Sequence, residues 1–158
     1  MHPLTHTTLV GNWATLLLAT NKNGEIDYNR MGDEIDILIA SSPCGIYSNG
    51  TAGEFYTQDE EEFIKISELL AEKCSAASIP FQIGVSHMSP QISLCRLQAV
   101  KSLNPGAVQV IFLIGFRSHW KSLLFFCKEW KKLQTEFLSS FTIRHMQKRY
   151  FLLMIGCI

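Results

Sequence analysis

The chain has 158 residues, which is enough for one domain with a buried core. A complete (β/α)8 barrel is longer, at about 250 residues. Hydrophobic residues make up 47% and charged residues 18%, a globular composition that excludes an intrinsically disordered chain. The longest apolar runs, 110–116 and 151–158, are far shorter than the roughly 18 residues of a membrane span. No basic stretch leads into an apolar core at the N-terminus, so we expect no signal peptide and no membrane anchor.

The formal net charge is zero, but the charges are distributed unevenly along the chain. Residues 1–111 hold six Lys and Arg against twelve Asp and Glu, whereas residues 112–158 hold eight against two. All five prolines lie in the first segment, and seven of the ten phenylalanines lie in the second. Because the change is so sharp, we divide the chain into residues 1–111 and a basic, aromatic tail of residues 112–158.

Cysteine usage predicts neither a disulfide framework nor a zinc site, because the count is odd and no pair has C-x-x-C spacing. The pattern suits a reducing cytoplasm. His2 and His6 stand four residues apart, but they lie in a terminal segment where we expect no metal site. The cysteines are Cys44, Cys74, Cys95, Cys127 and Cys157.

The first elements alternate between strand and helix. Residues Trp13–Leu18 form an apolar run typical of a strand that is buried on both faces. After a turn at Asn21–Gly24, Asp27 is expected to cap a helix. The apolar face of that helix comprises Tyr28, Met31, Ile35, Leu38 and Ile39.

The next unit starts with a short strand at Gly45–Ser48. Thr57 and Glu60 have the spacing of a capping box, which predicts a helix that begins between them. The apolar side of this helix would comprise Phe63, Ile66, Leu70 and Cys74.

Two further strands follow, at Pro80–Val85 and Ala107–Ile111. Between them, Ser89 is expected to cap a helix with Pro90 at its first position, and Asn104–Gly106 ends the unit. The alternation predicts an α/β fold with a parallel sheet, although periodicity alone leaves a doubly wound sheet and a barrel equally open.

A glycine-rich segment, Gly50–Glu54, directly follows the second strand. Ligands of parallel α/β folds bind at the C-terminal ends of strands, and small residues there let backbone amides approach an anion. A carboxylate or a phosphate would suit this loop, with the Thr51 hydroxyl as a further donor. On spacing alone, we favour a tight turn that needs glycine for its geometry.

Other polar residues are interpreted as structural. We expect His87 to be a solvated loop residue, and the acidic run 59–62 to be a solvated first helical turn that favours the helix dipole. Lys65, Lys73 and Lys101 fall on predicted helices rather than at strand ends, so none is placed as a Schiff-base nucleophile.

Three segments together resemble the dihydrodipicolinate synthase / N-acetylneuraminate lyase family: Trp13–Leu18, Gly45–Glu54 and Ile79–Val85. The resemblance covers residues 9–111 and implies the first four βα units of a (β/α)8 barrel. Ser42 and Ser78 stand where the family pattern has glycine.

The resemblance implies a class I aldolase or lyase that joins a lysine to the keto group of pyruvate or a related 2-oxo acid, with no cofactor and no metal. The substrate carboxylate would bind at Gly50, Thr51, Ala52 and Gly53. Many family members have a second hydroxyl residue at the position of Ala52. The intact family is expected to form homo-oligomers.

Neither the tyrosine nor the lysine of the family's later strands is found after Ile111. Read one base out of frame, however, residues 141–148 permit Tyr-Asn-Pro-Pro-His-Ala-Lys, which contains the family's tyrosine motif. We therefore interpret residues 112–158 as the product of a frame error near codon 111. We expect a truncated, inactive half-barrel that associates with itself through uncovered strand edges.

Two alternatives stay open. The chain could still act as an aldolase, with a tail lysine such as Lys121 or through pairing with another half-barrel. Alternatively, the tail could form a non-enzymatic binding module in which Lys128, Lys131 and Lys132, beside Trp120 and Trp130, contact nucleic acid or a membrane surface. We expect neither nucleic-acid nor membrane binding, because no recognisable motif for either is present.

Overall fold

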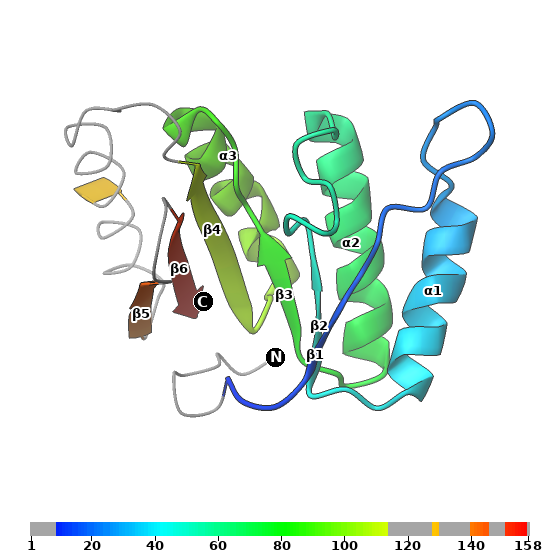
Figure 1. The fold of residues 1–158 in the computed structure, drawn as a ribbon. Helices are drawn as coiled ribbons and strands as arrows, with labels where there is room; N and C mark the ends of the chain where they lie inside the picture. Colours follow the sequence, from blue (N-terminus) through cyan, green and yellow to red (C-terminus); the bar gives the residue numbers. More distant parts are fainter. Residues whose placement is uncertain (1–8, 114–127, 130–139, 146–150, 158) are drawn as a thin grey trace.

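The computed structural model describes residues 9–113, 128–129, 140–145 and 151–157, and it describes side chains over residues 9–111 and 128–129. The described strands form one six-stranded sheet in the order β1-β2-β3-β4-β6-β5 (Figure 1). The strands are β1 (Trp13–Thr15), β2 (Gly45–Ser48), β3 (Phe81–Gly84), β4 (Ala107–Leu113), β5 (Ser140–His145) and β6 (Phe151–Cys157). The helices are α1 (Tyr28–Ala40), α2 (Glu60–Ala76) and α3 (Pro90–Val100), followed by a 3-10 turn, η1 (Lys101–Leu103).

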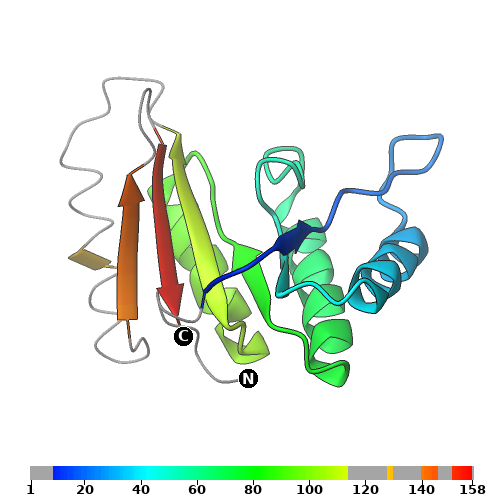
Figure 2. The ribbon, with the colours of Figure 1, turned by 60° about the horizontal axis from the view of Figure 1, so that its bottom comes forward.

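Strands β1 to β4 lie side by side in chain order, and every neighbouring pair among them is parallel. Each of the three connections between them contains a helix, and the helices cover one face of the parallel strands (Figure 2). This confirms the expected α/β class with a parallel sheet. The helix of a fourth βα unit is not among the described residues, so the four-unit half-barrel stays a prediction.

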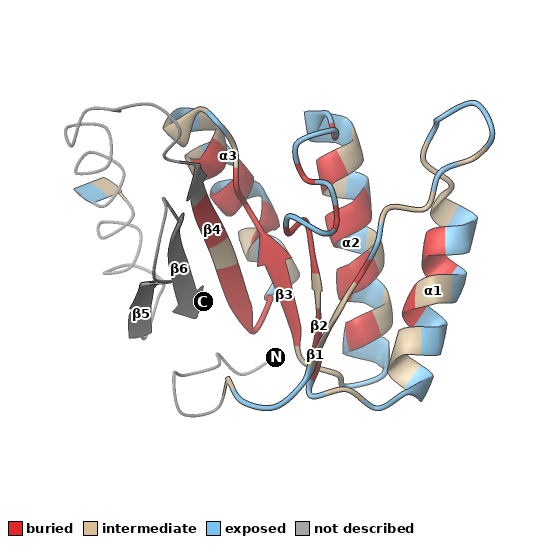
Figure 3. Cartoon of the chain, in the orientation of Figure 1, coloured by how far each residue is buried: buried red, intermediate tan, exposed pale blue. Residues whose placement is uncertain are grey.

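The core lies between the helices and the parallel strands, as the buried residues in Figure 3 show. Ile46, Ile83 and Val108 occupy the three central strands, and each is fully buried. The predicted apolar side of α2 is confirmed, because all four of its residues are buried. They are Phe63, Ile66, Leu70 and Cys74.

The first strand is shorter than predicted. Parallel pairing with β2 ends at Thr15, whereas the apolar run continues to Leu18. Beyond it, the Leu16 amide still donates to the Tyr47 carbonyl at 2.9 Å, and the Leu17 amide donates to Glu34 Oε1 at 2.8 Å. A side chain of α1 therefore replaces the neighbouring strand as hydrogen-bond partner, which ends the ladder.

The helix starts confirm the N-cap residues expected at Asp27 and Ser89 and correct the capping box of α2. Asp27 caps α1, because its side chain accepts from the Arg30 amide. The capping box of α2 is formed by Asp59 and Glu62, not by Thr57 and Glu60, because Asp59 directly precedes the first helical residue.

Thr57 lies outside the helix, where its hydroxyl donates to the Glu54 carbonyl at 2.8 Å. Pro90 is the first residue of α3, as predicted, and Ser89 is its N-cap residue. The Ser89 side chain makes no capping hydrogen bond and contacts Gln91 Oε1 at 3.1 Å instead. Asn104 adopts a left-handed conformation at the end of the third connection, where the predicted Asn104–Gly106 stop lies.

Ser42 and Ser78, the two positions where the resembled pattern has glycine, both adopt positive φ, at 53° and 56°. Each follows the C-cap residue of a helix, α1 or α2, where a left-handed residue commonly ends the helix. A side chain at such a position costs conformational energy that glycine avoids. The glycine pattern therefore reflects helix termination rather than a binding role.

The tail departs from the alternation of strand and helix. Strand β6 pairs antiparallel with β4, and β5 pairs antiparallel with β6. The apolar run at the C-terminus corresponds to β6. Within the described ranges, no helix is long and apolar enough to cross a membrane.

Candidate functional site

The loops that follow β1, β2 and β3 leave the sheet at one edge, because the strands are parallel. We call residues 49–58 the β2 loop and residues 85–89 the β3 loop. Both connect directly to a helix, α2 and α3 respectively. This edge is where a parallel α/β fold binds its ligands, and it contains the glycine-rich segment of the sequence.

In the β2 loop, the four residues predicted to bind a carboxylate form one turn. Gly50 and Gly53 are buried, whereas Thr51 and Ala52 are exposed. The amides of Thr51, Ala52 and Gly53 donate to no other atom of the described residues. Three backbone donors therefore have no acceptor within the described residues, while the turn itself is closed by the Glu54 amide, which donates to the Thr51 carbonyl at 3.2 Å.

Both glycines of this turn are required by close packing. A Cβ on Gly53 would lie 2.9 Å from the Leu16 carbonyl oxygen, at the end of β1. A Cβ on Gly50 would lie 2.8 Å from the ring of Tyr47, and 3.6 Å from Gln109 Oε1 on β4. The loop therefore packs closely on the strand ends, so that Thr51 and Ala52 are the residues left outermost.

Two buried carboxamides hold the β2 loop. Asn49 adopts a positive φ of 55°, and its Nδ2 donates to Ser67 Oγ of α2 at 3.1 Å. Gln58 Nε2 donates to the Gly53 carbonyl at 3.0 Å. Asn49 is 1% exposed and Gln58 8% exposed, so water competes little for these hydrogen bonds.

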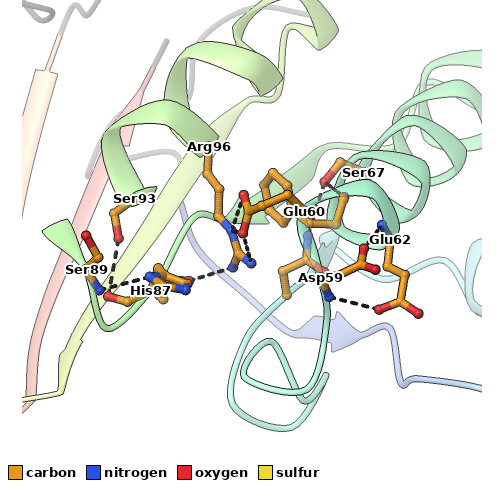
Figure 4. A network of polar contacts seen from close by, with 11 residues as sticks. Asp59, Glu60, Glu62, Ser67, His87, Ser89, Ser93 and Arg96 are labelled. Carbon is orange, nitrogen blue, oxygen red and sulfur yellow. Dashed lines mark hydrogen bonds and ion pairs between the residues drawn. The ribbon is translucent and has the colours of Figure 1, made fainter. Parts of the chain in front are cut away.

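The β3 loop is held by a buried cation. Arg96 of α3 is 1% exposed, forms an ion pair with Glu60 at 2.7 Å, and donates through Nη1 to the Ser86 carbonyl at 2.8 Å (Figure 4). Its guanidinium lies 4.5 Å from the centre of the Phe63 ring. Ser86 Oγ in turn accepts from the Ile111 amide at 2.8 Å, so the residue that Arg96 holds also contacts β4.

One sequence-based interpretation is corrected here. Glu60 was expected to be part of a solvated face, but it pairs with buried Arg96 because α2 and α3 pack side by side. His87 lies in a loop, as expected, where it is half-buried and its Nδ1 accepts from the Ser89 amide at 2.9 Å (Figure 4). The rest of the acidic run lies at the first turn of α2, as expected.

The three lysines predicted to lie away from the strand ends are placed as expected, whereas Lys22 lies in the turn after β1. Lys65 pairs with Glu61 at 2.7 Å on α2, Lys73 pairs with Asp36 at 2.6 Å between α2 and α1, and Lys101 lies in η1. Among the described residues, no group of His, Cys, Asp or Glu could hold a metal ion. His2, His6, Lys121, Lys131, Lys132, Trp120 and Trp130 lie outside the described residues.

The residues that hold the two loops were not predicted from the sequence. Asn49 directly precedes the glycine-rich turn, and asparagine is one of the few residues that tolerate a left-handed conformation. Ser67 and Arg96 are polar residues on otherwise apolar helix sides, a signal that they have buried partners. Three buried side-chain oxygens in this region have no hydrogen-bond partner within the described residues. They are Ser48 Oγ, Asn49 Oδ1 and Gln58 Oε1.

No family model matches the chain. Among curated proteins, the chain is 28% identical over 87 residues to a 4-hydroxy-tetrahydrodipicolinate synthase of Thermomicrobium roseum. The match covers 55% of this chain and 28% of that enzyme. The chain therefore spans less than a third of the length of this relative.

Solved structures show the same fold. YagE of E. coli K12, a prophage protein of the dihydrodipicolinic acid synthase family in complex with pyruvate, superposes with a TM-score of 0.69 at 18% identity, over 77% of this chain and 40% of YagE. CdNal of Clostridium difficile, in complex with mannosamine, gives a TM-score of 0.72 at 16% identity, over 78% and 43% of the two chains.

The N-acetylneuraminate lyase of Fusobacterium nucleatum gives a TM-score of 0.70 at 14% identity, over 82% of this chain and 44% of that enzyme. At such identities the structures establish the fold alone. Together with the curated relative, they confirm the resemblance to the dihydrodipicolinate synthase / N-acetylneuraminate lyase family over roughly the N-terminal part of the chain. No finding supports the alternative of a binding module built on the basic tail.

Proposed function

We propose that the β2 loop is the carboxylate-binding element of a class I aldolase-type lyase, and that it binds a 2-oxo acid such as pyruvate. One observation carries the proposal: the amides of Thr51, Ala52 and Gly53 have no partner within the described residues and lie at the ligand-binding edge of the parallel sheet. Backbone amides gathered in a turn bind anions without a cation. Thr51 adds a hydroxyl, and Ala52 contributes its amide only.

The test is a titration of the full chain with pyruvate, followed by the backbone amide resonances in NMR spectra. We expect resonances of residues 50–53 to shift. Thr51→Val should weaken the affinity about tenfold, because it removes one hydrogen bond to a charged group. Thr20→Val, at an exposed threonine after β1, is the matched control and should leave the affinity unchanged. Shifts scattered over other elements, or none, would overturn the proposal.

We further propose that these 158 residues bind the 2-oxo acid without forming an imine to it. Lys65 and Lys73 of α2 form ion pairs with Glu61 and Asp36, and Lys101 lies in η1. Lys22 lies in an exposed turn after β1, whereas a Schiff-base lysine is desolvated in a pocket. Incubation with pyruvate and sodium borohydride should therefore leave the mass of the chain unchanged. A lysine adduct would overturn this proposal, and peptide mapping would identify the residue that supplies the nucleophile.

The origin of residues 112–158 is a separate proposal: a change of reading frame near codon 111. It is supported by the abrupt change in charge and by the antiparallel pairing of β6 with β4, where a βα alternation would continue with a helix. Sequencing the gene through codon 111 tests it. If the shifted frame stays open, restoring one base should yield a chain that borohydride and pyruvate label on lysine. A closed or unrelated frame would show that the tail is authentic.

A further inference from the structure

The β2 loop has an anchor at its first residue. Asn49 Nδ2 donates to Ser67 Oγ at 3.1 Å, and Ser67 Oγ donates to the Phe63 carbonyl at 2.7 Å. The dashed contact of Ser67 within α2 is visible in Figure 4. Because Ser67 is fully buried and bonded to its own helix, it offers Asn49 an acceptor of fixed position. The start of the loop is thereby tied to the middle of α2.

The backbone of Asn49 is confined as well. Its φ of 55° turns the chain away from the direction of β2, and its carbonyl packs directly against Gly84, where a Cβ could not be accommodated. Its amide lies 3.4 Å from the point that a Cβ on Gly53 would occupy. The peptide that enters the turn is therefore fixed on two sides by the backbone and on a third by the side chain.

A second carboxamide holds the other end of the turn. Gln58 Nε2 donates to the Gly53 carbonyl at 3.0 Å from a buried position just before α2. The Gly53 carbonyl is thus directed toward Gln58, while the Glu54 amide closes the turn onto Thr51. The amides of Thr51, Ala52 and Gly53 lie between these two fixed points.

We propose that Asn49 and Gln58 are positioning residues, which hold the three amides in the geometry that receives a carboxylate without contacting the ligand themselves. The inference rests on the proposed function of the β2 loop. A turn that is already ordered loses little conformational freedom when the anion binds, so more of the interaction energy appears as affinity. Carboxamides suit this role because they hold the turn without introducing a charge that would compete with or repel the ligand.

The experiment compares pyruvate dissociation constants and the order parameters of the Thr51 and Ala52 amides in the full chain and its variants. Asn49→Gly keeps the left-handed conformation and removes the anchor, and Gln58→Ala removes the second hydrogen bond. We expect each to weaken pyruvate binding about three- to tenfold and to lower both order parameters. Ser67→Ala changes no atom of the loop, so it should reproduce the effect of Asn49→Gly and add nothing to it in the double variant.

Asn21→Gly is the matched control, because Asn21 also anchors a loop, through Oδ1 contacts to the amides of Asn23 and Glu25. It should leave pyruvate binding unchanged. If the unaltered chain binds pyruvate and the Asn49, Gln58 and Ser67 variants bind it equally well, the positioning role is refuted while the binding proposal stands. If the unaltered chain does not bind pyruvate, the proposed function fails. Order parameters that stay at the unaltered values in these variants would then refute the anchoring role as well.

Discussion

The β2 loop and the β3 loop leave the same edge of the sheet, but they are held by different chemistry. Neutral carboxamides of Asn49 and Gln58 hold the first, whereas the buried guanidinium of Arg96 holds the second. Glu60 compensates the charge of Arg96, so the cation is committed to its own loop. Two adjacent loops are thus held by different side chains, a pair of neutral carboxamides in one and an ion-paired cation in the other.

The β2 loop packs against the end of β3 where Gly84 lies next to the Asn49 carbonyl, and the largest effect is expected there. Gly84→Ala places a Cβ against a backbone oxygen that the positive φ of Asn49 cannot easily move. We expect a loss of about 3 kcal/mol or more in the free energy of unfolding, measured by urea denaturation. Gly24→Ala is the control for a glycine with open space around it, although its φ of 83° carries its own strain. Equal losses in the two variants would contradict the contact.

Removing Glu60, the ion-pair partner of buried Arg96, is expected to destabilise the β3 loop. Glu60→Ala leaves Arg96 buried without a counter-charge. Loss of one partner of a fully buried pair costs about 3–5 kcal/mol, and the 53% exposure of the Glu60 side chain reduces the expected loss to about 2–3 kcal/mol. Glu61→Ala, in the neighbouring surface pair with Lys65, should change the stability by less than about 0.5 kcal/mol. A milder effect at Glu60 than at Glu61 would refute the role assigned to the ion pair.

The helices that follow the two loops differ in whether their N-cap side chain makes a capping hydrogen bond. Asp59 accepts from the Glu62 amide at 2.8 Å, whereas Ser89 makes no capping hydrogen bond. Asp59→Ala should therefore lower the free energy of unfolding by about 1 kcal/mol. Ser89→Ala should lower it by less than about 0.5 kcal/mol. Thermal and urea denaturation of the two variants, side by side, distinguish the outcomes, and equal losses would contradict the described caps.

The smallest effect concerns the far end of α2, where Cys74 lies away from both loops. Burial raises the pKa of the Cys74 thiol from 9.0 to about 12. The fold therefore favours the neutral thiol, and this contribution is complete below pH 9 and is lost as the pH rises toward 12. Between pH 8 and pH 9 we expect a loss of about 0.4 kcal/mol relative to Cys74→Ala. Cys95→Ala is the control, because Cys95 is exposed. A pH-independent difference between the unaltered chain and Cys74→Ala would contradict the burial of the thiol.

The parts of the fold that follow from hydrophobic pattern could be predicted from the sequence. The four parallel strands, the cap at Asp27 and the buried side of α2 depend on residues whose spacing is visible along the chain. The start of α2 was misplaced by two residues, because Thr57 and Asp59 both have an acidic residue three positions later. Sequence spacing cannot distinguish two such overlapping caps, whereas the packing of Gln58 into the loop does.

The site could be predicted only in its backbone part. The glycine-rich turn was recognised because its residues are contiguous and follow a strand. The groups that hold it were missed because their partners are distant along the chain: Asn49 and Ser67 are separated by 18 residues, and Glu60 and Arg96 by 36. Such pairs depend on which elements lie side by side in the fold. Neither composition nor periodicity shows this.

The close approach of the Asn49 carbonyl to Gly84 also restricts how this chain can change over evolutionary time. Residue 84 can acquire a side chain only after the peptide at residue 49 has moved, and residue 49 can leave the left-handed conformation only if the turn after β2 is rebuilt. Either substitution alone passes through a destabilised intermediate. The two positions, 35 residues apart, are therefore expected to change only together, and loss of the glycine requires that the turn after β2 has already been remodelled.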